Sequence, residues 1–238
     1  MPLKQYLPPG KTDFCYLPLT AALPAFIIGC FCIIAPLPQL VLSKSSIAAM
    51  LLTACIGPIC GILLMTVFLV KSGGKKSLNL SPMTFKDFKY CFGGTFLIIF
   101  TYALVNALWK YFLTICQIPF AENQYLMLLA GQATGWEFFL LAILVTFPVP
   151  IAEELLFRRI LFAAFLQRSQ SLAWFGTAAV FAAVHLFLAG LPGLFIIGLG
   201  FQYLYISRQN LAVSIFSHSL LNACAVLAAW ASRGVLIQ

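Results

Sequence analysis

The apolar segment 136–165 contains the charged stretch Glu153-Glu154-Leu-Leu-Phe-Arg158-Arg159. The whole chain of 238 residues has only six acidic residues, so this one stretch holds a third of them. About 20 apolar residues in helical form cross a bilayer, and the segment exceeds that length. Ionisable side chains at membrane depth are costly and indicate function by default. The stretch therefore predicts a membrane-spanning helix that carries a functional site.

The composition of the full chain supports a membrane protein. Hydrophobic residues make up 62% and charged residues only 8%, whereas soluble domains have about 25% charged residues. This shortage of charge excludes a soluble domain, and it also excludes disorder, which needs polar and charged segments. The net charge of +8 could indicate nucleic-acid binding, but Lys and Arg also collect in the cytoplasmic loops of membrane proteins. We expect an integral membrane protein with no nucleic-acid partner.

Apolar segments long enough to cross a bilayer recur along the chain and predict an all-α, polytopic bundle of about seven transmembrane helices. Placing the N-terminus in the cytoplasm puts most Lys and Arg on the cytoplasmic side. Residues 1–134 then hold three N-terminal helices and a basic cytoplasmic loop (71–90) facing anionic headgroups. Residues 135–238 form the second part of the same membrane domain and contain the charged stretch. The expected helices cover residues 19–42, 46–70, 91–116, 136–165, 171–188, 193–206 and 211–230.

The two adjacent glutamates have different surroundings on a helix. Glu154 and Arg158 are four residues apart, so they share one face and can form an ion pair. Glu153 points about 100° away and has no basic residue one turn further along. One carboxylate is therefore expected to brace the helix, while Glu153 is the candidate general base.

Both histidines of the chain, His185 and His218, lie inside predicted helices. Glu153 and His185 are nearly equidistant from the polar turn 168–171, so an antiparallel pair of helices would bring them face to face. Phe181 lies one turn before His185 and is expected to wall the same pocket. Each residue alone is equally compatible with a helix–helix contact, but together they indicate a shared site.

One turn after His218, Asn222 projects from the same face of its helix. Amide hydrolysis needs a base that activates water and donors that stabilise the oxyanion. Glu153 with His185 can provide the first, and His218 with Asn222 the second. A nucleophilic Ser or Cys mechanism lacks support, because no hydroxyl or thiol has a matching position beside a histidine.

Three motifs follow one another on separate predicted helices: Glu153-Glu154-x-x-x-Arg158, Phe181-x-x-x-His185 and His218-x-x-x-Asn222. Together they resemble the CPBP family of intramembrane glutamic proteases. This family includes the type II CaaX prenyl endopeptidases and bacterial proteins linked to bacteriocin maturation and self-immunity. The resemblance implies a four-helix catalytic core with Glu153 as base, His185 holding the water, and His218 and Asn222 as the oxyanion site. It also implies that no metal is needed. Zinc bound by Glu153, His185 and His218 remains an alternative, since such side chains are plausible ligands.

We therefore expect an endopeptidase that acts on a lipidated or membrane-associated peptide or protein in the lipid bilayer. Two other functions stay open: a transporter or ion path, which also uses intramembrane charged residues, and a non-catalytic immunity or scaffold protein of the same fold. The compact size favours a bacterial plasma membrane. The sequence specifies neither the substrate nor the oligomeric state.

Overall fold

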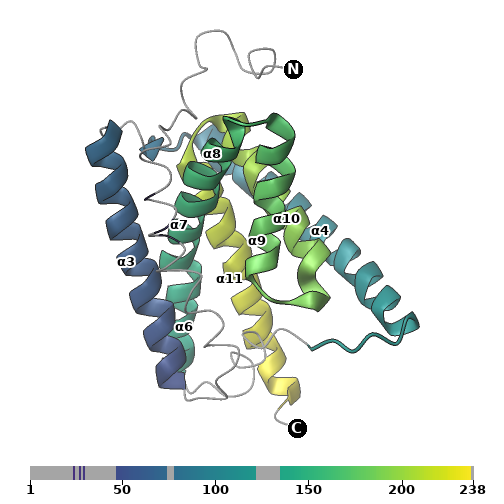
Figure 1. Cartoon of the computed structure of the whole chain (residues 1–238). Helices are drawn as coiled ribbons and strands as arrows, with labels where there is room; N and C mark the ends of the chain where they lie inside the picture. Colours follow the sequence, from purple (N-terminus) through teal and green to yellow (C-terminus); the bar gives the residue numbers. More distant parts are fainter. Residues whose placement is uncertain are drawn as a thin grey trace.

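In the computed structural model, every regular element among the described residues is helical, as predicted. The structure describes residues 47–73, 78–121 and 135–236, together with positions 24, 27 and 29. The elements, shown in Figure 1, are α3 (Ile47–Gly73), α4 (Phe85–Ile115), α6 (Gly135–Thr146), α7 (Pro148–Glu154), the π-helix η4 (Leu155–Leu161), α8 (Phe162–Leu166), the π-helix η5 (Leu172–Gly176), α9 (Thr177–Val184), the 3₁₀-helix η6 (Leu188–Gly190), α10 (Leu191–Arg208) and α11 (Leu211–Leu236).

Four helical stretches are long and apolar enough to cross a membrane, and the protein is an integral multi-pass membrane protein. These stretches are Phe85–Ile115, Gly135–Leu166, Leu188–Arg208 and Leu211–Arg233. Gly57–Lys71 and Leu172–Val184 are shorter apolar helices. The expected helix 19–42 lies outside the described residues apart from three positions. The expected helix 171–188 is shorter in the structure, because α9 ends at Val184.

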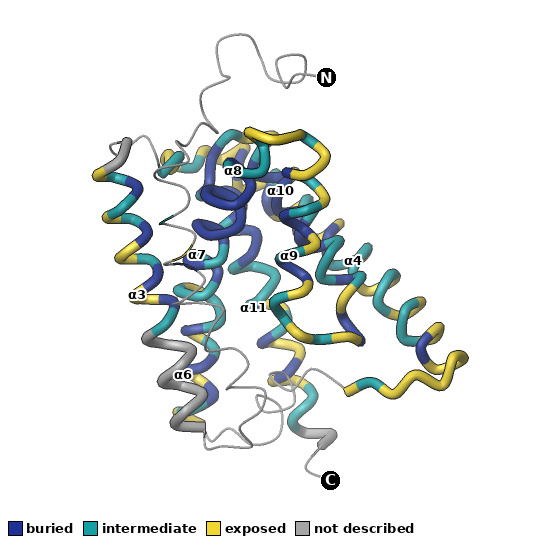
Figure 2. The backbone as a smooth tube through the Cα atoms, in the orientation of Figure 1, coloured by how far each residue is buried: buried dark blue, intermediate teal, exposed yellow. Residues whose placement is uncertain are grey.

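The segment that contains the two glutamates forms the centre of the bundle. α6, α7, η4 and α8 follow one another in a nearly continuous rod, with α3 on one side and α11 on the other (Figure 1). Every residue of η4 is buried, and the tube in Figure 2 is dark blue between α7 and α8. α10 packs against α4 and α9. The charged stretch therefore lies where several helices meet, rather than facing lipid.

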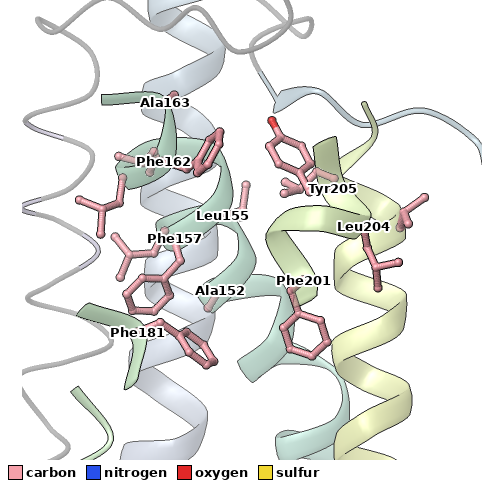
Figure 3. Packing of buried hydrophobic residues seen from close by; sticks show 14 of the residues in the cluster. Ala152, Leu155, Phe157, Phe162, Ala163, Phe181, Phe201, Leu204 and Tyr205 are labelled. Carbon is pink, nitrogen blue, oxygen red and sulfur yellow. The ribbon is translucent and has the colours of Figure 1, made fainter. Parts of the chain in front are cut away.

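Apolar side chains from these helices form one core around η4. Figure 3 shows the part of it in which Phe157 and Phe181 approach from one side and Phe201 from another. The rings of Phe157 and Phe181 meet edge to face, with centroids 5.2 Å apart. This aromatic end of the core borders the ionisable residues described below.

α4 begins six residues before the predicted start at Cys91, and its N-terminus explains why. The side chain of Thr84 accepts a hydrogen bond from the Asp87 N–H while the Asp87 carboxylate accepts one from the Thr84 N–H, which is a capping box. Upstream, the Ser81 N–H donates to Asn210 Oδ1 over 3.1 Å, and the Leu211 N–H donates to the Asn79 carbonyl. In the described part of the expected basic loop, residues 71–73 therefore belong to α3, residues from Phe85 onward belong to α4, and the segment before α4 is docked on the α10–α11 turn.

Candidate active site

Glu154, the last residue of α7, is fully buried at the centre of the site. Its Oε1 lies 2.9 Å from Arg158 Nη1 and 2.8 Å from His218 Nδ1. The predicted one-turn contact between Glu154 and Arg158 is formed, and the second partner comes from α11. Because a buried charge is tolerated only with partners, this carboxylate joins α7, η4 and α11 through an ion pair with Arg158 and a hydrogen bond with His218.

Arg158 lies in η4 and is also fully buried. Its Nη2 donates to the carbonyl of Gly198 in α10 over 3.3 Å. The guanidinium carbon lies 4.6 Å from the ring centroid of Phe181 and 5.3 Å from that of Phe201. Aromatic rings at this range attract a cation, more so when it is desolvated. Arg158 is therefore fixed by a carboxylate, a carbonyl and two rings.

His218 connects the two glutamates. Its Nδ1 contacts Glu154, and its Nε2 lies 3.8 Å from Oε2 of Glu153. The imidazole is nearly parallel to the ring of Phe201, with centroids 4.7 Å apart at 26°, and Phe181 approaches it edge-on at 6.1 Å. Since Glu154 can only accept a hydrogen bond when ionised, Nδ1 is assigned as the protonated nitrogen. Nε2 is thereby directed toward Glu153.

Glu153 keeps a free acceptor at this site. Its side chain is 12% exposed, and Oε2 is buried without a hydrogen-bond donor among the described residues. Buried carboxylate oxygens normally have a donor. An oxygen of this kind, 3.8 Å from an imidazole nitrogen, is suited to accept a proton from a small polar molecule.

His185 caps the C-terminus of α9 and is bound locally. Its Nδ1 lies 2.7 Å from the Phe181 carbonyl, and the rings of the two residues are 4.8 Å apart. No hydrogen bond or ion pair within the described chain joins His185 to Glu153, so the direct pairing expected from equal depth is not formed. The next residue, Leu186, has a φ of 50°, a region that side chains larger than Gly rarely adopt. The chain therefore turns at Leu186, directly after His185, and α9 ends here.

Asn222, like His185, forms its hydrogen bond outside the charged cluster. Its Nδ2 donates to the Val145 carbonyl over 2.9 Å and ties α11 to α6. In the described residues, no hydrogen bond joins it to His218, although both lie on one helix face. The structure thus brings Glu153, Glu154, Arg158 and His218 into one connected set. His185 lies beside it through Phe181, and Asn222 lies one turn further along α11.

The zinc alternative requires a different arrangement of these side chains. Within the described residues, no group of three or more His, Cys, Asp or Glu side chains is placed to hold a metal ion. His185 and His218 are separated by Phe181, whose ring contacts both imidazoles. Coordination by Glu153, His185 and His218 together would need these side chains to move.

Three features of the site were not predicted from the sequence. Phe201 and Gly198 lie in α10, which has no ionisable residue near the site and gave no polar signal. The π-helical form of η4 was also missed, because 3.6-residue periodicity does not distinguish it from an α-helix. π-Helical turns within α-helices are frequent at functional sites, and here one carries Arg158.

Comparison with known proteins supports the resemblance seen in the motifs. Residues 135–224 match the family model described as type II CAAX prenyl endopeptidase Rce1-like. The chain is also 26% identical over 159 residues to the protein named "Putative membrane peptidase YdiL" from Bacillus subtilis (strain 168). That match covers 66% of this chain and 60% of the relative, so the chain spans less than two thirds of the relative's length. No solved structure matches.

The matched segment begins at α6 and ends within α11, and it contains every residue of the site described above. The similarity to the Rce1-like family of type II CAAX prenyl endopeptidases is therefore confined to the part of the chain that holds the site. Both comparisons match the chain to membrane peptidases.

Proposed function

We propose that this protein is an intramembrane endopeptidase in which Glu153 activates the water that attacks a peptide bond. The observation that supports this most strongly is the chain of contacts from Arg158 through Glu154 and His218 to Glu153. It gives the two glutamates unequal roles. Oε2 lacks a hydrogen-bond donor among the described residues in both glutamates. Glu154 is fully buried and has two partners on Oε1, whereas the side chain of Glu153 is 12% exposed.

In the proposed reaction, Glu153 accepts a proton from water while the water oxygen bonds to the carbonyl carbon of the substrate. The carbonyl oxygen becomes an oxyanion. His218, whose Nδ1 proton is held by Glu154, presents Nε2–H to this oxyanion as an imidazolium. Glu153 then passes its proton to the amide nitrogen, the C–N bond breaks as the oxyanion reforms a C=O bond, and the products are a carboxylic acid and an amine.

The other two polar residues are assigned supporting positions in this proposal. With Nδ1–H of His185 donated to the Phe181 carbonyl, Nε2 of His185 is an acceptor that can hold the second hydrogen of the water. Asn222 supplies a second donor for the oxyanion after exchanging its bond to the Val145 carbonyl for the substrate. Glu154, Arg158 and Phe181 fix the geometry around His218.

The substrate we propose is a lipidated or membrane-associated peptide, because the site lies among helices that cross the bilayer.

We further propose that residues 135–238 form the catalytic part and that residues 1–134 precede it within one membrane domain. In this proposal the protein lies in a bacterial plasma membrane with its N-terminus in the cytoplasm. The cationic residues Lys71, Lys86, Lys89, Arg168 and Arg208 lie at the helix ends that would then face the cytoplasm.

The function can be tested by comparing the peptides of cells that produce the wild type with those of cells that produce Glu153→Gln. The substitution keeps the shape of the side chain but removes the base. A substrate should accumulate uncut in the variant cells, and its two fragments should disappear from mass spectra. Glu137→Gln, in the first turn of α6, is the matched control and should resemble the wild type. Identical peptide profiles for Glu153→Gln and wild type, at equal protein levels, would refute the proposal.

A further inference from the structure

An apolar groove lies on the other side of α10 from Arg158. It is formed by α4, α10 and the π-helix η5, and its volume is about 640 Å³. This volume falls within the range of about 300–1,000 Å³ that is common for small-molecule sites. The lining is apolar except for the hydroxyls of Tyr90, Tyr203 and Thr101 and the indole N–H of Trp174. None of the residues assigned to catalysis lines it.

The length of the groove matches one leaflet of a bilayer. Along α4 it extends from Tyr90 to Thr101, which is roughly 16 Å at 1.5 Å per residue. Half of a hydrocarbon core about 30 Å thick is roughly 15 Å. Tyr90 and Tyr203 lie near one end, where tyrosines are commonly found at the membrane–water interface. A single hydrocarbon chain entering from that interface would therefore fill the groove along its length.

The tyrosine end of the groove is positively charged. Lys86 lies one turn before Tyr90 on the same face of α4, and Lys89 lies one turn before Gly93. Both lysines are exposed. The nearby carboxylate of Asp87 is buried and bound by Arg208, with Nε and Oδ1 2.6 Å apart. The acidic charge at this end is thus already neutralised. Lys89 Nζ lies 4.8 Å from the ring centroid of Phe85, a contact that leaves its positive charge in place, so both lysines can attract an anion.

From these observations we infer that the groove binds an anionic phospholipid, with one acyl chain between α4 and α10 and the phosphate beside Lys86 and Lys89. A zwitterionic lipid would fit the groove equally well but would gain less from the lysines, since each basic residue near an anionic lipid surface favours binding about fivefold. Lipid binding in this groove does not depend on the proposed peptidase chemistry.

Three glycines line the groove and differ in the space around them. A Cβ atom at Gly94 would lie 2.6 Å from Leu204 Cδ2, and one at Gly200 would lie 2.5 Å from Ile98 Cγ1. These two glycines allow α4 and α10 to approach closely and close the floor of the groove. At Gly93, a Cβ atom would meet nothing within 4 Å. A side chain added at Gly93 would therefore enter the open groove without displacing the core.

The test is native mass spectrometry of the full chain in detergent, titrated with phosphatidylglycerol or phosphatidylcholine. The wild type should bind one phosphatidylglycerol at least about tenfold more tightly than phosphatidylcholine, as two lysines contribute. Gly93→Trp should abolish this single binding event, and Gly93→Ala, which leaves the groove open, should retain it. Lys86→Gln should weaken phosphatidylglycerol binding about fivefold and leave phosphatidylcholine binding unchanged.

Leu97→Trp provides a second blocking variant, because Leu97 lines the groove and is 64% exposed. If both Trp variants are folded by circular dichroism and bind phosphatidylglycerol like the wild type, the inference is wrong. Equal affinity for the two lipids, unaffected by Lys86→Gln, would also refute an anionic ligand. A dimer that forms in the wild type and is lost in Gly93→Trp, without any change in lipid binding, would identify a second copy of the chain as the occupant instead.

Discussion

The buried contact between Glu154 and Arg158 should show strong energetic coupling. Both side chains are fully buried, with 2.9 Å between Arg158 Nη1 and Glu154 Oε1. Removing one partner of a buried ion pair leaves an uncompensated charge and costs about 3–5 kcal/mol. Arg158→Met would also lose the hydrogen bond to the Gly198 carbonyl. We expect Arg158→Met and Glu154→Gln each to lower the free energy of unfolding by about 3 kcal/mol or more.

The double variant should be far more stable than the sum of the single effects implies, because neither buried charge is left without its partner. Independent effects would add to about 6 kcal/mol, whereas we expect a total near 3 kcal/mol and a coupling energy of about 3 kcal/mol. The free energies can be measured by unfolding the purified protein in mixed micelles of a mild detergent and sodium dodecyl sulfate, with circular dichroism as the signal.

The ion pair between Asp87 and Arg208 offers a matched control for this cycle. Its distance is also short, 2.6 Å, but the side chain of Arg208 is 36% exposed. Water screens such a pair, so a cycle with Asp87→Asn and Arg208→Gln should give a coupling of about 1 kcal/mol or less. Additive effects at Glu154 and Arg158, or equal coupling in the two cycles, would refute the view that burial makes the central pair interdependent.

Three further predictions concern the surroundings of the site. Phe201→Leu removes the ring stacked 4.7 Å from His218. Because the loss of one aromatic contact corresponds to about tenfold in rate, kcat should fall about tenfold with KM little changed. An unchanged kcat would rule out a positioning role for the ring. Gly198→Val places a Cβ atom 3.1 Å from the backbone Cα of Ala178. This close contact should lower the free energy of unfolding by about 1–3 kcal/mol. An unfolding curve like that of the wild type would contradict such tight packing. Peptide cleavage by the purified protein should survive extensive chelation, and a loss of activity that zinc restores would instead support the metal alternative.

Much of the fold could be predicted because the membrane limits the possible structures. The apolar segment 136–165 corresponds to the rod from Gly135 to Leu166, and the segment 211–230 lies within α11. The contact between Glu154 and Arg158 followed from helical spacing alone and is formed. These features depend on local periodicity and composition, which a single sequence records directly.

The contacts between helices could not be predicted in the same way. Equal depth suggested that Glu153 faces His185, but depth does not define the rotation of a helix about its axis. In the structure, Glu153 Oε2 lies 3.8 Å from His218 Nε2, whereas His185 Nδ1 is bound to the Phe181 carbonyl of its own helix. The π-helix η4 also adds a local change in rotation that 3.6-residue periodicity does not anticipate.

The role of Glu153 as the base is tested most directly by the cleavage rate of the purified protein in lipid vesicles. The substrate is the peptide that accumulates in cells producing Glu153→Gln, and the wild type and that variant are compared at equal, folded concentrations. A general base contributes about 100-fold or more to the rate, so kcat should fall at least about 100-fold while the unfolding curve is retained. A folded Glu153→Gln protein that cleaves within twofold of the wild-type rate would contradict the mechanism.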